Sequence, residues 1–119
     1  MSKEKKNIPQ NNFFLDNIID ILLVQKCTNI KVFELKDNNY SDIAILCSAN
    51  SNVQMNSSVK KIQLLAKERK QEFISEGLNS SWVLVEFLGI TIHFFSEEAR
   101  EYYNLEDLYF DSNLVNQYG

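Results

Sequence analysis

The most constraining feature of this chain is a pair of β-rich segments with a two-residue break between them. Trp82–Phe87 and Ile90–Phe95 consist almost entirely of β-branched, aromatic and other apolar residues. Leu88 and Gly89 separate the two segments, and two residues are the length of a tight hairpin loop. The spacing therefore predicts two strands joined by a hairpin.

Hydrophobic periodicity predicts the elements that precede this hairpin. Residues 12–27 have apolar side chains at three- and four-residue steps, which indicates an amphipathic helix with Asn12 as its N-cap. Residues 30–35 and 43–47 are short apolar runs bounded by polar residues, so each predicts a strand. The polar loop 48–52 then supplies capping side chains for a long helix. The apolar stripe of that helix is Met55, Val59, Ile62 and Ala66.

Weaker signals predict the remaining elements. Residues 73–74 suggest a brief edge strand, and Ser96 places a capping hydroxyl before a short helix that runs to Tyr103. A further turn follows at Leu105–Tyr109. This order of elements predicts an α/β layer fold in which helices pack on a mixed β-sheet.

Length and composition set the domain organisation. A chain of 119 residues with 45% hydrophobic residues has room for one hydrophobic core. Residues 1–11 are polar and are predicted to form a disordered lead-in, residues 12–110 a single α/β domain, and residues 111–119 a flexible tail without clear periodicity.

Charge and targeting signals restrict the partners. The net charge of -4 provides no global positive field, so direct binding to DNA or to another phosphate backbone is disfavoured, whereas docking on a basic protein is compatible. The polar start of the chain lacks an apolar signal core, and no apolar run has the length of a membrane span. We therefore expect a protein of the cytoplasm, or of the equivalent matrix of an organelle, that does not bind membranes.

Residue types that support catalysis or cofactor binding occur singly. His93 is the only histidine and sits in a predicted strand, where a structural or interface role is favoured over that of a general base. Cys27 and Cys47 lie in apolar stretches without C-x-x-C spacing, which predicts buried free thiols. The three glycines form no phosphate-binding loop, and the loop 48–52 lacks the paired acidic metal ligands of a nucleotidyltransferase. We predict a protein that is not an enzyme.

Aromatic and acidic residues accumulate near the end of the chain. Its tyrosines and Trp82, near Arg100, are typical both of a packed core and of a protein interface, and the sequence leaves these two interpretations open. The neighbouring carboxylates are explained by helix capping and a solvated face rather than by a metal or catalytic cluster. These carboxylates are Glu97, Glu98, Glu101, Glu106 and Asp107.

Two stretches resemble a known family. The segment WVLVEFLGITIHFFSEEAREYYNLEDLY at residues 82–109 resembles its pattern of tryptophan, apolar strand, second strand ending in histidine, and E-A-R-E-x-Y-x-L-E-x-L. Residues 41–47, followed by Ser51, Asn52 and Gln54, resemble its S-x-A-D-Y strand and T-S-N-R-Q helix start. The chain is thereby identified as similar to the ribosome-silencing factors, or Iojap family. Departures from the family pattern occur at Ile43, Ala49, Val53, Leu88 and Tyr109.

The resemblance implies a fold and a function. Such proteins resemble a nucleotidyltransferase core without catalytic residues, need no cofactor and tend to form homodimers when free. They bind the large ribosomal subunit through a ribosomal protein of the fourteenth large-subunit family, block joining with the small subunit and so repress translation. A degenerate nucleotidyltransferase and a homodimeric adaptor without ribosomal role are the alternatives. Carried over by position, the expected partner-binding residues are Asp42, Trp82, His93, Arg100, Glu101, Tyr103 and Leu108; Glu98 and Leu105 also match.

Overall fold

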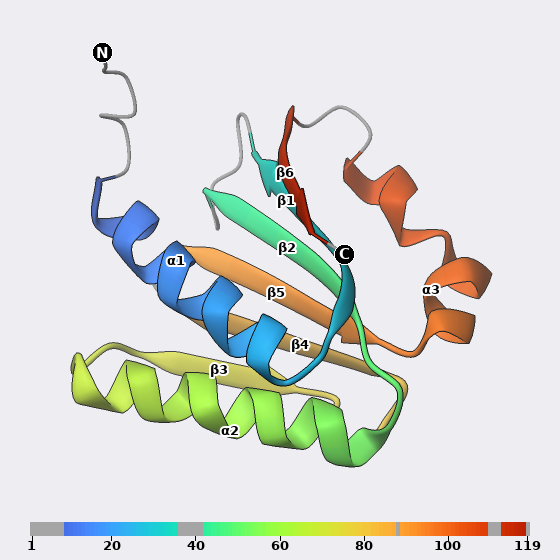
Figure 1. The fold of residues 1–119 in the computed structure, drawn as a ribbon, viewed down its shortest axis with the longest axis horizontal. Helices are drawn as coiled ribbons and strands as arrows, with labels where there is room; N and C mark the ends of the chain where they lie inside the picture. Colours follow the sequence, from blue (N-terminus) through green and yellow to red (C-terminus); the bar gives the residue numbers. More distant parts are fainter. Residues whose placement is uncertain (1–8, 36–41, 88, 110–112, 119) are drawn as a thin grey trace.

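The computed structural model describes residues 9–35, 42–87, 89–109 and 113–118 of the chain. The side chains of residues 9–13, 105 and 108 are also outside the description. Groups of strands are separated by helices along the chain (Figure 1). The elements are α1 (Pro9–Val24), β1 (Thr28–Glu34), β2 (Ile43–Ser48), α2 (Asn52–Glu68), β3 (Phe73–Glu76), β4 (Trp82–Phe87), β5 (Ile90–Phe95), α3 (Glu97–Tyr103), a 3-10 helix η2 (Leu105–Tyr109) and β6 (Asn113–Tyr118).

The strands form one six-stranded mixed sheet in the order β3-β4-β5-β2-β1-β6. β2 and β5 pair in parallel, and the other neighbours pair antiparallel. The predicted hairpin is confirmed, with Phe87 opposite Ile90 and with Gly89 at a positive φ of 76° that a glycine adopts without steric cost. The mixed α/β sheet predicted from the order of elements is therefore present.

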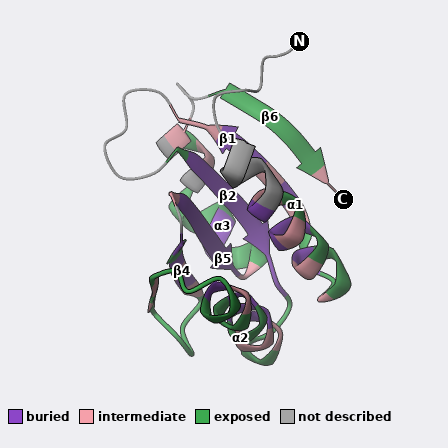
Figure 2. Cartoon of the chain, turned by 90° about the vertical axis from the view of Figure 1, so that its left-hand side faces the viewer, coloured by how far each residue is buried: buried purple, intermediate pink, exposed green. Residues whose placement is uncertain are grey.

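Helices α1 and α2 cover one face of the sheet and enclose the main core. Alternate residues of β1, β2, β4 and β5 point into it, and Ile18 and Leu22 of α1 are fully buried there. The stripe predicted for α2 is buried as expected. β2 is buried along its whole length at the centre of the sheet, as Figure 2 shows. Burying each such apolar side chain stabilises the folded state by roughly 1.5–3 kcal/mol relative to leaving it exposed.

A smaller cluster lies on the opposite face of the sheet. Phe33, Leu46 and Phe95 point to this side and pack with Ala99 of α3. Trp82 and Tyr109 lie against them and are only partly buried. Figure 1 shows α3 and the turn after it set apart from α1 and α2. In the described part of the chain, the short α3 and η2 are the helices that cover this face, and aromatic side chains lie at its border.

The polar loop before α2 caps that helix. Ser51 is the N-cap, and its Oγ accepts a hydrogen bond of 3.1 Å from the Gln54 backbone N–H. The Gln54 amide oxygen in turn accepts from the Asn50 N–H at 2.5 Å. The capping role predicted for this loop is confirmed.

The ends of the described chain differ from expectation. α1 begins at Pro9 rather than Asn12, because proline is accepted in the first helical turn, where its missing N–H has no intrahelical acceptor. Residues 1–8 of the predicted lead-in lie outside the described residues. The absence of regular structure expected after residue 110 is corrected, because Asn113–Tyr118 form β6 and pair with β1. Pairing with a distant strand, which a local pattern does not show, stabilises this segment.

Two further expectations concern the core and membranes. Cys27 and Cys47 are free and buried, as predicted, and the Cys27 Sγ lies 3.7 Å from the Ser58 Oγ. A hydrogen bond from the Cys47 thiol outweighs burial and lowers the pKa of Cys27 to about 7. Among the helices described, none is long and apolar enough to cross a bilayer.

Candidate partner-binding surface

Helix α3 is fixed at both ends by local signals in the sequence. Ser96 is its N-cap, with its Oγ accepting a hydrogen bond of 3.1 Å from the Ala99 N–H. Glu97 and Glu98 occupy the first turn, where carboxylates interact favourably with the helix dipole. Asn104 ends the helix in the left-handed conformation at φ 52°, and its N–H binds the Arg100 carbonyl. The next residues therefore turn back onto the sheet as η2.

A chain of hydrogen bonds connects the sheet to η2 through His93. The Trp82 Nε1–H donates to His93 Nδ1 at 3.1 Å, and His93 Nε2 lies 2.9 Å from the Tyr109 hydroxyl. An indole nitrogen can only donate, so Nδ1 accepts and Nε2 carries the proton that binds Tyr109. Burial lowers the pKa of His93 to about 4, which keeps the imidazole neutral. This geometry supports the structural role favoured for His93.

Arg100 joins α3 to three other elements from a buried position. Only 3% of its surface is exposed. Its Nε and Nη2 donate to Glu106 Oε2 at 3.0 and 2.8 Å. Its Nη1 donates to the Asn29 carbonyl at 2.6 Å and to the Ser48 hydroxyl at 2.9 Å. The Arg100 guanidinium is therefore engaged within the protein, whereas Glu101 and Tyr102, which follow it on α3, are exposed.

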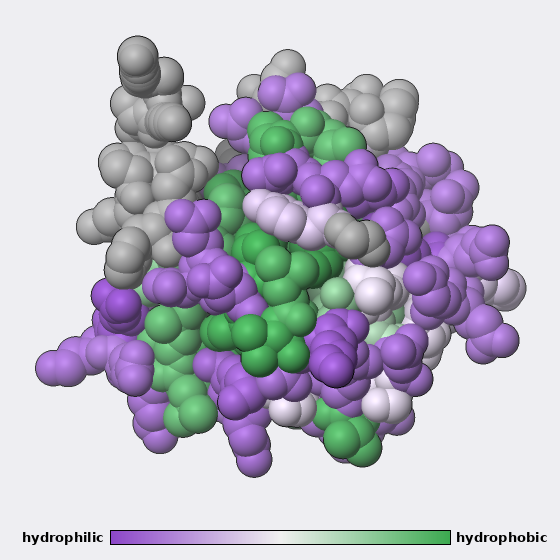
Figure 3. Space-filling model, viewed as in Figure 1, coloured by the Kyte–Doolittle hydropathy of each residue, from purple (hydrophilic) through white to green (hydrophobic). Residues whose placement is uncertain are grey.

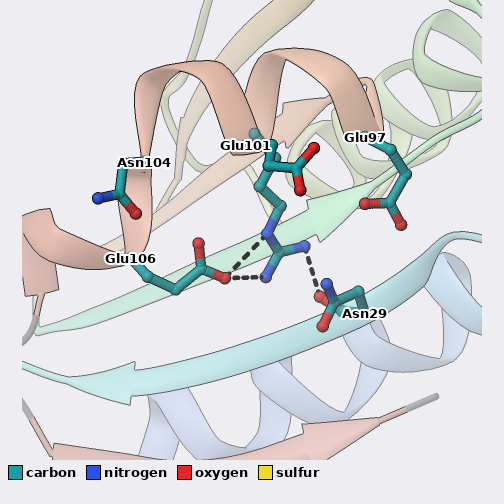
Figure 4. Close-up of a pocket in the computed structure, with 6 residues that line it drawn as sticks. Asn29, Glu97, Glu101, Asn104 and Glu106 are labelled. Atoms are coloured by element: carbon teal, nitrogen blue, oxygen red, sulfur yellow. Dashed lines mark hydrogen bonds and ion pairs between the residues drawn. The ribbon is translucent and has the colours of Figure 1, made fainter.

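A shallow acidic pocket lies beside this guanidinium. Figure 4 shows Glu106 and Asn29 contacting it from two directions, while Glu97 and Glu101 project from α3. The pocket has a volume of about 270 Å³. Burial alone would raise the pKa of Glu106, but the hydrogen bonds and charge of Arg100, aided by Lys31 at 3.4 Å, bring that pKa below its usual value.

The neighbouring carboxylates have separate structural roles. Glu97 and Glu98 lie in the first turn of α3, Glu106 binds Arg100, and Asp107 accepts a hydrogen bond of 2.8 Å from Asn104 Nδ2. Within the described residues, no group of three or more His, Cys, Asp or Glu side chains is arranged to hold a metal ion. The capping explanation is supported for Glu97 and Glu98, which lie in the first turn of α3.

Exposed aromatic rings line the border of the second face. Tyr102 is 82% exposed and Tyr103 is 53% exposed, and the centroids of their rings lie 5.0 Å apart. Tyr103 also packs on Trp82 with a centroid distance of 5.6 Å. We call Trp82, Tyr102 and Tyr103 the aromatic ridge. A shallow pocket of about 440 Å³ beside it is lined in part by the two tyrosines and Glu98.

The structure brings five of the seven predicted binding residues into one region. Trp82 and Tyr103 belong to the ridge, and His93 accepts a hydrogen bond from Trp82. Arg100 lies at the Phe95 ring, on which Trp82 packs, and Glu101 is exposed on α3. Tyr102, the third member of the ridge, is not among the predicted binding residues, although the tandem tyrosines at the end of a short helix are a signal in the sequence.

Two predicted residues stand apart from this region. Asp42 precedes β2, whereas Trp82 pairs with Phe95 at the far end of β5. Since β2 and β5 run in parallel for six residues, about 17–20 Å separates these ends. The side chain of Leu108 lies outside the described residues. Asp42 would therefore contact a different part of any partner than the ridge does.

Comparison with known proteins identifies relatives. Residues 8–118 match the family model described as ribosomal silencing factor during starvation, RsfS. The chain is 32% identical over 80 residues to ribosomal silencing factor RsfS of Bacillus subtilis (strain 168), covering 63% of this chain and 65% of that protein. It is 31% identical over 77 residues to RsfS of Halalkalibacterium halodurans, covering 63% of this chain and 66% of the relative. The match thus spans slightly less than two thirds of either relative.

Solved structures show the same fold. A crystal structure of a protein from Bacillus halodurans has a TM-score of 0.75 at 24% identity and covers 88% of this chain and 98% of that one. An X-ray crystal structure of a protein from Chromobacterium violaceum has a TM-score of 0.72 at 25% identity and covers 86% of each chain. The arrangement of the sheet and helices is therefore shared with these two proteins.

Proposed function

This chain belongs to the ribosomal silencing factor family, and we propose that it represses translation by occupying the large ribosomal subunit so that the small subunit cannot join. The partner in this proposal is a basic ribosomal protein of the fourteenth large-subunit family. The mechanism is steric exclusion, which needs an interface of about 800 Å² per partner but no reactive group.

The aromatic ridge is the observation that carries the proposal. Tyrosine and tryptophan are enriched among residues that dominate interface energies, and here Tyr102 and Tyr103 are exposed while Trp82 is partly exposed beside them. The exposed carboxylates Glu98 and Glu101 lie on the same helix as the two tyrosines, so the surface is both aromatic and acidic. Such a surface complements a basic protein in charge and provides rigid apolar anchors.

Further features belong to the same proposal. The protein acts without catalysis and without a cofactor, in the cytoplasm, away from DNA and membranes, and forms a homodimer when free. Its sheet is a nucleotidyltransferase-like core that no longer binds nucleotide. The capping hydrogen bonds around Ser51 and Gln54 support the loss of nucleotide binding, because they engage the loop that would contact phosphates.

Subunit joining tests the proposal directly. Purified protein is added to separated small and large subunits, and a sucrose gradient then measures the fraction of joined ribosomes. We expect the protein to reduce this fraction and to migrate with free large subunits. The double variant Tyr102→Ala, Tyr103→Ala should lose both effects.

A matched control comes from the other side of the molecule. Val53 is an exposed apolar residue of α2, so Val53→Ala should retain the activity. Joined ribosomes that form normally at saturating wild-type protein would refute the steric mechanism. Migration with large subunits without loss of joining would instead support an adaptor role.

A further inference from the structure

A groove lies on the face of the sheet opposite the aromatic ridge, between helix α2 and strand β3. Its volume is about 370 Å³, and its apolar lining comes from Leu64, Ala66 and Phe73. Leu64 is 57% exposed. We call this the α2–β3 groove. Figure 3 shows the face that carries α1 and α2, where apolar patches alternate with hydrophilic side chains.

The backbone beside the groove is available for pairing. β3 is the terminal strand of the sheet order, so in the described part of the chain its outer edge has no neighbouring strand. An open edge presents N–H and C=O groups that can bind another extended segment. A helix packed next to such an edge provides side-chain contacts for a segment that pairs with it, and this combination is a recurring mode of peptide recognition.

The charge around the groove differs in sign from that of the whole chain. Residues 52–76, which span α2 and β3, contain five lysines and arginines and three glutamates, a formal charge of +2 in a chain of net charge -4. Lys60 and Lys67 line the groove itself. They are two helical turns apart, about 10.5 Å along the axis. Carboxylates four residues apart on an added strand would be about 13 Å apart, within reach of both flexible lysines.

From these three features we propose that the α2–β3 groove binds an extended acidic segment of a partner protein, which adds to β3 as a further strand. The segment places an apolar side chain against Leu64 and Phe73 and carboxylates near Lys60 and Lys67. An apolar lining beside an open strand edge favours a peptide over a nucleic acid. The phosphates of a nucleic acid would contact the lysines but would use neither the apolar lining nor the strand edge. This surface is independent of the proposed ribosomal function.

A designed peptide probes the groove. The peptide Thr-Glu-Thr-Val-Thr-Glu-Thr directs its two glutamates and its valine to one side when extended. Titrated into ¹⁵N-labelled protein at physiological salt, it should shift the amide signals of β3 and of residues 60–67 but not those of α3. The same peptide with lysine in place of glutamate should bind about tenfold more weakly or not at all.

Two sets of variants separate charge attraction from strand addition. Lys60→Glu with Lys67→Glu should weaken peptide binding about tenfold, whereas Lys61→Glu with Lys70→Glu makes the same charge change away from the groove and should leave affinity nearly unchanged. Two further peptides are N-methylated at alternate backbone amides, one at the even-numbered and one at the odd-numbered residues, and both keep their charge. One of the two should lose binding, because its methyl groups replace the N–H groups that pair with β3.

Other outcomes would overturn the proposal. Equal binding of the lysine peptide, or undiminished binding of both methylated peptides, would exclude an acidic strand in this groove. If only the amide signals of β6 shifted, the peptide would bind at the opposite edge of the sheet and not at β3. Displacement of the peptide by a single-stranded oligouridine at equal charge concentration would identify a phosphate-binding surface instead.

Discussion

Tyr102 and Trp82 belong to the same ridge, but truncating them would not report the same property. Trp82 is half-buried, packs on Phe95 at a centroid distance of 6.0 Å and donates its indole N–H to His93. Removing its ring would therefore disturb the fold as well as the surface. Tyr102 is largely exposed and has its main aromatic contact with Tyr103, so its truncation reports chiefly on binding.

We predict that Tyr102→Ala weakens binding to the large subunit by about 1–2 kcal/mol, because an exposed tyrosine at the centre of a contact is a typical interface anchor. The affinity should fall about five- to thirtyfold in a co-sedimentation titration. The melting temperature should remain that of the wild type. Unchanged affinity for Tyr102→Ala and Tyr103→Ala alike would place the contact elsewhere, with Asp42 as the next position to test.

His93 gives a pH-dependent stability with a definite sign. Its pKa is about 4 in the folded protein and about 6.5 when unfolded, so between these values the unfolded chain binds the additional proton. Stability is complete above pH 6.5 and falls as the pH drops towards 4. The loss should be about 1.5 kcal/mol between pH 6.5 and 5, measured by urea unfolding.

A single substitution isolates this effect. His93 is the only histidine of the chain, and Gln can accept from Trp82 and donate to Tyr109 without titrating. His93→Gln should therefore flatten the dependence between pH 5 and 6.5, whatever its own stability. An equal slope in both proteins would mean that another group causes it. Turnover abolished by His93→Ala would contradict the non-enzymatic proposal.

Residue type alone does not distinguish an exposed side chain that can bind a partner from a buried side chain that holds the fold together. Arg100 and Tyr103 are both frequent interface residues, yet the Arg100 guanidinium is buried and Tyr103 is exposed. The difference arises because Arg100 binds Asn29 and Ser48, which precede it by 71 and 52 residues. No local pattern encodes contacts of that separation, so the sequence could not separate the buried role of Arg100 from the exposed position of Tyr103.

At the scale of elements, the sequence predicted those helices and strands that have a turn, a capping residue or an apolar stripe of their own. The β4–β5 hairpin has its turn, α2 its polar cap and stripe, and α3 its Ser96 cap. β6 has none of these, since NLVNQY contains two aliphatic residues among amides and five of its six side chains are exposed. Its structure depends on pairing with β1, some 80 residues earlier in the chain. The sequence therefore gave no reason to expect it.

The Arg100 network predicts how firmly α3 and η2 are attached to the sheet. Arg100→Met keeps much of the side-chain volume but leaves Glu106, the Asn29 carbonyl and the Ser48 hydroxyl without their donor. We expect a loss of about 3 kcal/mol in the free energy of unfolding, measured with urea. Lys61→Met on the exposed side of α2 is the control and should stay within about 0.5 kcal/mol of wild type. A stability change as small as the control's would show that the network is not holding these elements.

At the scale of the whole molecule, opposite charges occupy opposite faces of one sheet. Residues 97–109 contain five carboxylates and one arginine, a formal charge of -4, whereas residues 52–70 have +4. α3 and α2 lie on different sides of the sheet. The net charge of -4 therefore conceals a dipolar distribution, which would orient the protein as it approaches a basic partner.

This distribution predicts that association with the large subunit slows as salt rises. The acidic helix α3 should lead the encounter, so the on-rate should fall about tenfold between low and physiological salt. Glu98→Lys with Glu101→Lys should slow association at low salt and remove most of the salt dependence. Glu68→Lys with Glu72→Lys makes the same change in net charge at the other face, where both carboxylates are exposed, and should affect the on-rate much less. Stopped-flow measurements compare the three proteins. Equal slowing by both pairs of substitutions would mean that net charge alone steers the encounter. An on-rate that does not change with salt would exclude electrostatic steering and leave the aromatic ridge as the source of affinity.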